Sequence, residues 1–122
     1  MLKRVLVVED DLLNRMMFCA VLREGGYQVE EVADERLTLA EVEGFGPDLI
    51  VLDIHLPHVS GIDIIKLLKS NVTLRNIPVL AVTGYVGKGV EHKVRSAGAS
   101  GYLAKPVSMK PFLEAVGGLI AA

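Results

Sequence analysis

Charged and hydroxyl side chains stand directly after four short apolar runs of this 122-residue sequence. Glu9 and Asp10 follow VLVV, Asp53 follows LIVL, Thr83 follows PVLAV, and Lys105 follows GYLA. An ionised carboxylate such as Asp53 is costly in a dry core, so it must reach solvent, have a partner, or both. Taken singly, each residue has an ordinary explanation, such as a helix N-cap or an exposed lysine. Their recurrence at equivalent positions favours a shared site.

Metal-dependent phosphoryl transfer is the chemistry that these residue types favour if they converge. Carboxylates that converge repel one another, and a divalent cation relieves that repulsion. A site of carboxylate oxygens, a backbone carbonyl and water suits Mg²⁺, for which Mn²⁺ is expected to substitute. Thr83 and Lys105 offer a hydroxyl donor and a movable positive charge for phosphoryl oxygens. Asp53 is then expected to be the nucleophile that accepts the phosphoryl group as an acyl phosphate.

The apolar runs alternate with longer segments of helical periodicity, and this alternation predicts an α/β fold. Strands are expected at residues 5–8, 27–32, 49–52, 78–82 and 101–104, and helices at residues 13–23, 37–42, 62–68, 90–97 and 109–120. Strands that are apolar on both faces predict a doubly wound, five-stranded parallel sheet. A flavodoxin-like strand order of 2-1-3-4-5 makes strands one and three neighbours at the carboxyl edge where ligands bind. The second strand alternates in polarity, which places it at a sheet edge.

The composition limits the possible classes of protein. A net charge of −2 and a pI near 5.9 argue against direct DNA binding. No apolar stretch is long enough for membrane insertion, and the N-terminal apolar run is too short for a secretory signal. The single cysteine, Cys19, lies in an apolar helical pattern and is expected to be a buried, inert thiol. We therefore expect one cytoplasmic domain over residues 1–122, with no output domain.

The motifs VLVVEDD, LIVLDIHLPHVSG, PVLAVTG and YLAKP together resemble the receiver domain of two-component response regulators, the CheY-like superfamily. The resemblance extends over essentially the whole chain. It implies that Asp53 accepts phosphoryl from the phosphohistidine of a sensor histidine kinase or a histidine phosphotransfer protein. It also implies that Asp10 binds Mg²⁺ directly and Glu9 binds it through water, while Asp53 and the backbone carbonyl of His55 complete the protein ligands.

The same resemblance implies a conformational switch that is passed to a downstream protein effector. Thr83 and Lys105 are expected to contact the phosphoryl oxygens, and Tyr102 is expected to change rotamer on phosphorylation, although core packing explains Tyr102 equally well. The bond between Lys105 and Pro106 is a candidate cis peptide. Gly84 stands where alanine is more common in the family, and the glycine-rich run TGYVGKG from Thr83 onward predicts a mobile loop.

Other functions remain open from the sequence alone. One is a Mg²⁺-dependent phosphatase that works through an aspartyl-phosphate, although His55 stands where such enzymes usually carry a second acid. Another is a receiver-shaped scaffold that is never phosphorylated, and a third is a relay that passes phosphoryl onward to a histidine phosphotransfer protein. His55 and His58 are interpreted as solvated side chains and not as a transition-metal pair, because no further histidine or cysteine ligand stands nearby.

Overall fold

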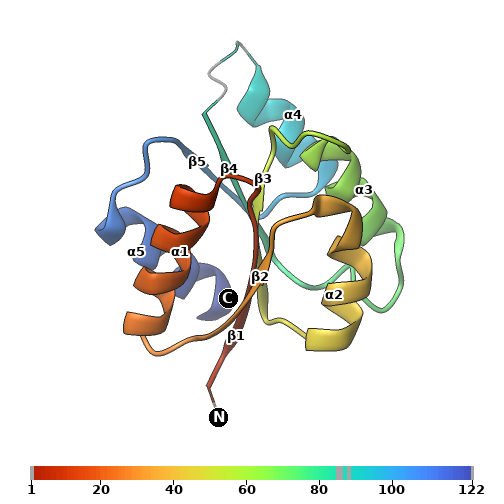
Figure 1. Cartoon of the computed structure of the whole chain (residues 1–122). Helices are drawn as coiled ribbons and strands as arrows, with labels where there is room; N and C mark the ends of the chain where they lie inside the picture. Colours follow the sequence, from red (N-terminus) through yellow and green to blue (C-terminus); the bar gives the residue numbers. More distant parts are fainter. Residues whose placement is uncertain (1, 85–86, 88, 122) are drawn as a thin grey trace.

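The computed structural model of the chain describes residues 2–84, 87 and 89–121 (Figure 1). The strands are β1 (Arg4–Val8), β2 (Gln28–Val32), β3 (Leu49–Asp53), β4 (Val79–Thr83) and β5 (Gly101–Ala104). The helices are α1 (Leu12–Glu24), α2 (Thr38–Phe45), α3 (Gly61–Ser70), α4 (Val90–Ala97) and α5 (Met109–Ala121), with the short 3₁₀ helix η1 (Glu35–Leu37) directly before α2. The predicted alternation of strands and helices is confirmed.

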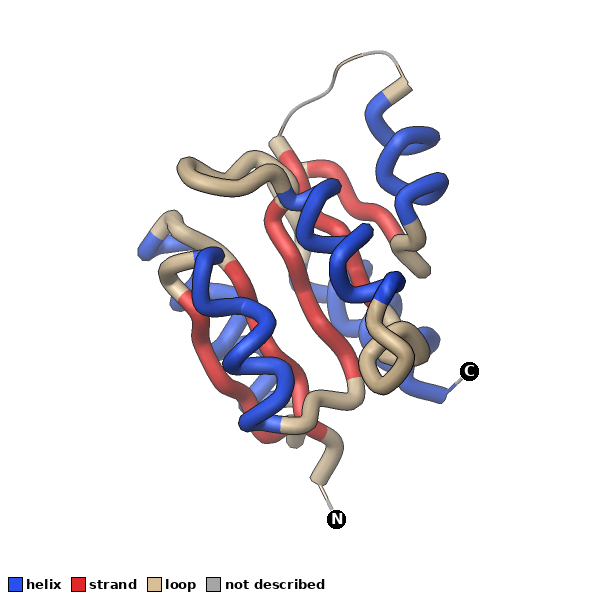
Figure 2. The backbone as a smooth tube through the Cα atoms, turned by 90° about the vertical axis from the view of Figure 1, so that its right-hand side faces the viewer, coloured by secondary structure: helices blue, strands red, loops and turns tan. Residues whose placement is uncertain are grey.

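The five strands form one parallel sheet in the order β2-β1-β3-β4-β5. Helices cover both faces of the sheet, with α1 and α5 on one side and α2, α3 and α4 on the other (Figures 1 and 2). The predicted doubly wound fold and the edge position of β2 are therefore confirmed. Val8 lies opposite Leu52 in the register of β1 and β3, so the residues that follow them, Glu9 and Asp53, lie side by side at this end of the sheet.

Alternating side chains fill a core on each face of the sheet. In β1, Val5 and Val7 pack in the core that α1 and α5 cover, whereas Leu6 and Val8 pack in the core that α2, α3 and α4 cover. Successive side chains of a strand point to opposite faces, so a central strand with helices on both sides must be apolar throughout. The continuous apolar runs of the sequence reflect this double burial.

Two expectations from composition can be compared with the structure. Cys19 is buried, and that burial raises the pKa of its thiol to about 11, so the thiolate is scarce at neutral pH. Within residues 2–84, 87 and 89–121, no helix has both the length and the apolar character needed to cross a bilayer.

Side-chain caps and glycines set the helix boundaries. Asp11 caps α1 by accepting a 2.9 Å hydrogen bond from the backbone N–H of Asn14, and Ser60 caps α3 in the same manner. Gly46 and Gly98 end α2 and α4 with φ angles of 66° and 123°, a region that residues with a Cβ rarely adopt.

The observed elements differ from the predicted ones mainly at their ends. Strands β3 and β4 each continue one residue further than expected and thereby include Asp53 and Thr83. Pro78 stands just before β4, because it has no N–H to contribute to a sheet. The predicted mobile loop spans residues 83–89, and its residues 85, 86 and 88 lie outside the described residues.

Candidate functional site

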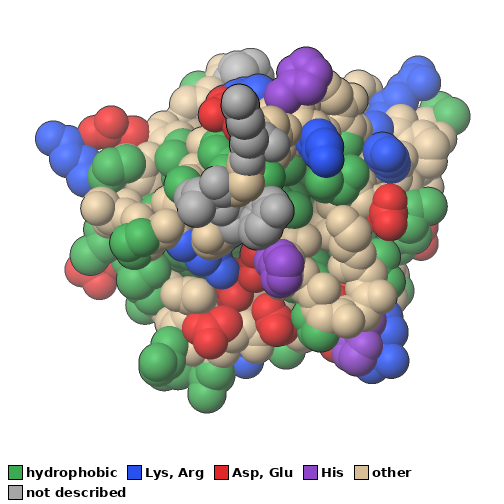
Figure 3. All heavy atoms as spheres, turned by 90° about the horizontal axis from the view of Figure 1, so that it is seen from above, with side chains coloured by type: hydrophobic (Ala, Val, Ile, Leu, Met, Phe, Trp, Pro, Cys, Tyr) green, Lys and Arg blue, Asp and Glu red, His purple; other side chains and the backbone are tan. Residues whose placement is uncertain are grey.

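A cavity of about 390 Å³ opens at the carboxyl end of the sheet, above β1 and β3. Its lining is Glu9, Asp10, Asp11, Asn14, Asp53, His55, Gly84 and Lys105. Seen from above, acidic side chains gather beside a basic side chain and a histidine at this end of the molecule (Figure 3). The sequence-predicted residues Glu9, Asp10, Asp53 and Lys105 are therefore brought together.

Strand alternation explains why Glu9, Asp53 and Lys105 meet. The residue two positions before each of them packs in the core beneath α1 and α5. Because side chains two apart in a strand share a face, the chain directs all three polar groups to that same side. They come from the ends of β1, β3 and β5, so the site exists only when the sheet has formed.

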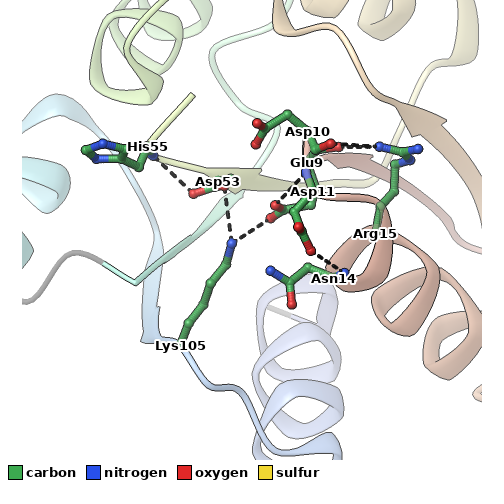
Figure 4. A network of polar contacts seen from close by, with 8 residues as sticks. All are labelled: Glu9, Asp10, Asp11, Asn14, Arg15, Asp53, His55 and Lys105. Atoms are coloured by element: carbon green, nitrogen blue, oxygen red, sulfur yellow. Dashed lines mark hydrogen bonds and ion pairs between the residues drawn. The ribbon is translucent and has the colours of Figure 1, made fainter. Parts of the chain in front are cut away.

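Lys105 holds the two buried carboxylates together. Its Nζ donates a hydrogen bond of 2.9 Å to Glu9 Oε2 and one of 3.2 Å to Asp53 Oδ2 (Figure 4). The exposed fraction of the whole residue is 1% for Glu9 and 4% for Asp53. Carboxylates this far from water need a charged or hydrogen-bonded partner, and the lysine supplies both.

The electrostatics of the pocket raise the pKa of both Glu9 and Lys105. Burial, together with the neighbouring negative charge of Asp53, raises the pKa of Glu9 to about 7, although the hydrogen bond and the charge of Lys105 oppose the rise. Burial lowers the pKa of Lys105, but hydrogen bonds and charges from Glu9 and Asp53 outweigh this and raise it above its usual value. Lys105 is therefore a permanent cation, whereas Glu9 changes its charge near neutral pH.

The loop after β3 fixes the position of Asp53. The backbone N–H of His55 donates a 3.0 Å hydrogen bond to Asp53 Oδ1, and the loop closes through a 3.0 Å bond from Gly61 N–H to the Ile54 carbonyl. A Cβ on Gly61 would lie 2.7 Å from the carbonyl oxygen of Asp53 and 2.6 Å from Ile54 Cα. Only glycine permits this close approach, so Gly61 helps to hold the backbone that carries Asp53.

The acidic run after β1 gives each acid a separate position. Asp10 is exposed at the rim of the pocket, while Asp11 turns to cap α1 and donates its own N–H to Glu9 Oε1 at 3.2 Å. Arg15 donates to the Glu9 carbonyl at 2.9 Å and holds this backbone in place (Figure 4). Glu9, Asp10 and Asp53 each offer a carboxylate oxygen, and these oxygens lie within 4.8 Å of one another. An all-oxygen group of this kind fits Mg²⁺.

Thr83 and Tyr102 lie toward the opposite side of the sheet. Thr83 is fully buried at the end of β4, and Tyr102 is half-buried against the core beneath α2, α3 and α4. Neither side chain lines the cavity, whereas the adjacent Gly84 does. The Lys105–Pro106 bond is cis, as the resemblance implied.

Some residues of the site were missed from the sequence. Asn14 and Gly84 line the cavity, and Gly61 supports Asp53 from behind. Asn14 stands three residues after the helix cap Asp11, a spacing that brings it back toward the strand end. No local pattern distinguishes Gly61 from an ordinary turn glycine, because its role depends on contact with β3.

Comparison with known proteins finds several that are similar to this chain. The family model described as the response regulator receiver domain matches residues 5–117. The chain is 39% identical over 116 residues to the polar-differentiation response regulator DivK of Brucella ovis, covering 95% of this chain and 94% of that protein. Among solved structures it is similar to a CheY-like receiver domain protein from Methanospirillum hungatei, at 29% identity and a TM-score of 0.91, with 99% of this chain and 95% of that chain covered. It is also similar to the chemotaxis protein CheY4 of Vibrio cholerae, at 27% identity and a TM-score of 0.90, with 98% and 99% covered.

Proposed function

The chain belongs to the response regulator receiver domain family, and we propose that it is a phosphoryl acceptor that signals through phosphorylation-dependent protein contacts. One observation carries the proposal. Asp53 stands at the floor of an open cavity with the Lys105 ammonium 3.2 Å from one oxygen and a second acidic group beside it. A nucleophile, a fixed positive charge and a cluster of metal-ligand oxygens are the groups that phosphoryl transfer to a carboxylate requires.

The proposed step moves one phosphoryl group from a donor nitrogen to an aspartate oxygen. A carboxylate oxygen of Asp53 attacks the phosphorus of a phosphohistidine, a P–O bond forms, and the P–N bond breaks. The electron pair of the broken bond stays on the imidazole of the donor, which then takes up a proton. Lys105 lies beside Asp53 and stabilises the negative charge on the transferring oxygens.

Mg²⁺ is part of this proposal because the donor set fits it. Asp10 and Asp53 would hold the ion, with Glu9 acting through water and His55 contributing its backbone carbonyl. When bound, Mg²⁺ supplies positive charge that reduces repulsion between the carboxylates and the phosphoryl group. The lysine offsets only one of the three acidic charges, so the pocket retains a deficit of positive charge for a cation to fill.

The proposed output is a change on the face of α4 and β5. Thr83 and Tyr102 lie on the same side of the sheet, in neighbouring strands whose register pairs Ala81 with Tyr102. A phosphoryl group on Asp53 offers Thr83 a charged hydrogen-bond partner, and movement of Thr83 makes space for the Tyr102 ring. Such a change shifts an equilibrium between two arrangements, and the shifted face binds a downstream protein effector.

The proposed donor is a sensor histidine kinase or a histidine phosphotransfer protein, encountered in the cytoplasm. Any such donor must cover the rim of the cavity to bring its histidine to Asp53. Leu12, Leu13 and Met16 of α1 are 57%, 76% and 55% exposed and follow the rim residue Asp11. This apolar surface suits contact with a helix of the donor. Because a relative is a polar-differentiation regulator, we include a role in cell-cycle or differentiation signalling in the proposal.

Substitution of the acceptor tests this function. Asp53→Asn should abolish labelling by a small phosphoryl donor such as acetyl phosphate, because the amide is nearly isosteric but a poor nucleophile. Asp63→Asn is the matched control, since Asp63 is an exposed acid in the first turn of α3 and should leave labelling unchanged. Trapping of an acyl phosphate on any residue other than Asp53 would refute the assignment.

A turnover assay separates the proposal from an enzymatic role. We propose that the protein catalyses only its own phosphorylation and dephosphorylation and does not act on stable phosphate esters, so a chromogenic phosphate ester should not be hydrolysed above the rate without protein. Sustained turnover would instead support an aspartyl-phosphate phosphatase. Stable labelling followed by transfer to a histidine phosphotransfer protein would place the chain within a relay.

A further inference from the structure

A second group of metal-ligand side chains lies away from the phosphoryl pocket. Asp34, Glu35 and His58 each offer one donor atom, and these atoms all lie within 4.8 Å of one another. Asp34 and Glu35 stand where β2 leads into α2, and His58 stands in the loop between β3 and α3. The two segments lie side by side at this end of the molecule (Figure 1).

Glu35 is the unusual member of this group because its carboxylate is buried and only half satisfied. The residue is 2% exposed. Its Oε2 accepts hydrogen bonds from the backbone N–H groups of His58 at 2.9 Å and Val59 at 3.4 Å. Its Oε1 is buried and accepts no hydrogen bond from any described residue. A buried carboxylate oxygen with open lone pairs is costly unless a donor or a cation occupies the position next to it.

Asp34 is held in an ionised state beside this buried acid. Its carboxylate caps η1 and accepts hydrogen bonds from the Arg36 side chain at 2.7 to 3.2 Å. These bonds, with the backbone N–H of Arg36, lower the pKa of Asp34 to about 2. The Arg36 side chain is 59% exposed, and an exposed ion pair of this kind contributes little free energy, so a cation can displace it.

We propose that Asp34, Glu35 and His58 bind a divalent transition-metal ion such as Zn²⁺. One imidazole nitrogen and two carboxylate oxygens form the mixed donor set that Zn²⁺ accepts and that Mg²⁺, which requires oxygen ligands, does not favour. Under this proposal His58 is a ligand and not only a solvated side chain, and the two acids that accompany it come from a segment distant in sequence. Water completes the coordination on the exposed side.

The bound ion would add a link between two loops that the hydrogen bonds from His58 and Val59 to Glu35 already join. The loop that carries His58 begins at Asp53 and contains His55, whose N–H holds the Asp53 carboxylate. A metal at its tip therefore restrains the same segment that positions the proposed acceptor. Such a restraint couples the two sites, so each ligand changes the affinity for the other by the same factor.

Calorimetric titration of the full chain with ZnCl₂ tests the site. Excess Mg²⁺ is present throughout, so that the oxygen ligands of Glu9, Asp10 and Asp53 are already occupied. We expect uptake of one Zn²⁺ per chain under these conditions. Absence of Zn²⁺ binding in excess Mg²⁺ would overturn the proposal, because only the acidic pocket would then hold the metal.

Four variants give the titration its specificity. His58→Gln should weaken Zn²⁺ binding by roughly tenfold or more, since it removes the nitrogen ligand while its backbone N–H still reaches Glu35. Glu35→Gln should weaken binding similarly, with circular dichroism as a check on folding. His92→Gln removes an unrelated histidine of α4 and should change nothing. Arg36→Gln should strengthen binding by removing the competing cation. Equal Zn²⁺ affinity in wild type and His58→Gln would overturn the assignment even if Glu35→Gln failed to fold.

Discussion

Lys105 donates a 2.9 Å hydrogen bond to Glu9, and this contact joins the end of β5 to the end of β1 across the whole width of the pocket. The same ammonium lies 3.2 Å from Asp53 at the end of β3, which lies between them in the sheet. One cation therefore serves two buried carboxylates, with a third acid, Asp10, at the rim. The pocket is built to be completed by additional positive charge.

Removal of this lysine should strengthen Mg²⁺ binding while it weakens the metal-free fold. In Lys105→Met, Glu9 and Asp53 lose their common counter-ion, so we expect Mg²⁺ affinity to rise by roughly tenfold. Without metal, two unpaired buried acids should lower the free energy of unfolding by about 3 kcal/mol. Isothermal titration calorimetry measures the Mg²⁺ affinity, and urea unfolding in EDTA measures the stability of the metal-free protein. Weaker Mg²⁺ binding in the variant would show that Lys105 is not competing with the metal.

The raised pKa of Glu9 predicts that the metal-free protein loses stability as pH increases. Unfolded Glu9 titrates near 4.5 and folded Glu9 near 7, so the unfolded state releases its proton first. Between these two pKa values, Glu9 is ionised in the unfolded state but still protonated in the folded state, where burial disfavours its charge. The free energy of unfolding should fall across this window, by on the order of 3 kcal/mol from this group.

Glu9→Gln isolates that contribution because the amide does not titrate. The difference in unfolding free energy, wild type minus variant, should decline from pH 4.5 to about 7 in EDTA and then level off. Mg²⁺ binding favours the ionised acid, so excess Mg²⁺ should flatten the wild-type profile. A difference that is constant across this pH window would mean that Glu9 keeps its ordinary pKa.

The fold and most of the site followed from patterns within single segments. Apolar runs that end in Asp53 or in Glu9 and Asp10 locate strand ends, and parallel pairing brings these ends together. Glu35 could not be identified in this way, because its burial depends on the loop that carries His58. Contacts between distant segments, and not local propensity, determine which acids are buried.

Gly61 illustrates the same limit and makes a prediction of its own. In Gly61→Ala the new Cβ would lie 2.7 Å from the Asp53 carbonyl oxygen, so the backbone that carries the acceptor must shift. We expect a loss of about 1–3 kcal/mol in unfolding free energy and slower phosphoryl labelling. Thermal unfolding and acetyl phosphate labelling measure these effects. Gly44→Ala is the control, since its Cβ meets nothing within 4 Å inside α2, and it should stabilise by up to about 1 kcal/mol.

Gly84 should tolerate substitution by alanine. Its φ lies outside the left-handed region, and an added Cβ would rest 3.9 Å from both Cβ and Cδ of Lys105, an ordinary van der Waals contact. Gly84→Ala should therefore stabilise the protein by about 0.4–1 kcal/mol, chiefly because alanine restricts the unfolded chain. Urea unfolding measures this gain, and labelling of Asp53 should persist because no polar group of the pocket changes.

Gly26→Ala provides the matched comparison for that experiment. Gly26 has no neighbouring atom within 4 Å of an added Cβ, so an alanine there meets no steric contact, but its φ of +92° is one that alanine rarely adopts. Gly26→Ala should therefore destabilise the protein by about 1 kcal/mol, because alanine is strained in the backbone conformation of Gly26. If both variants lost stability equally, the backbone at Gly84 would be strained in solution, and the glycine would serve the pocket by its conformation and not by leaving space beside Lys105.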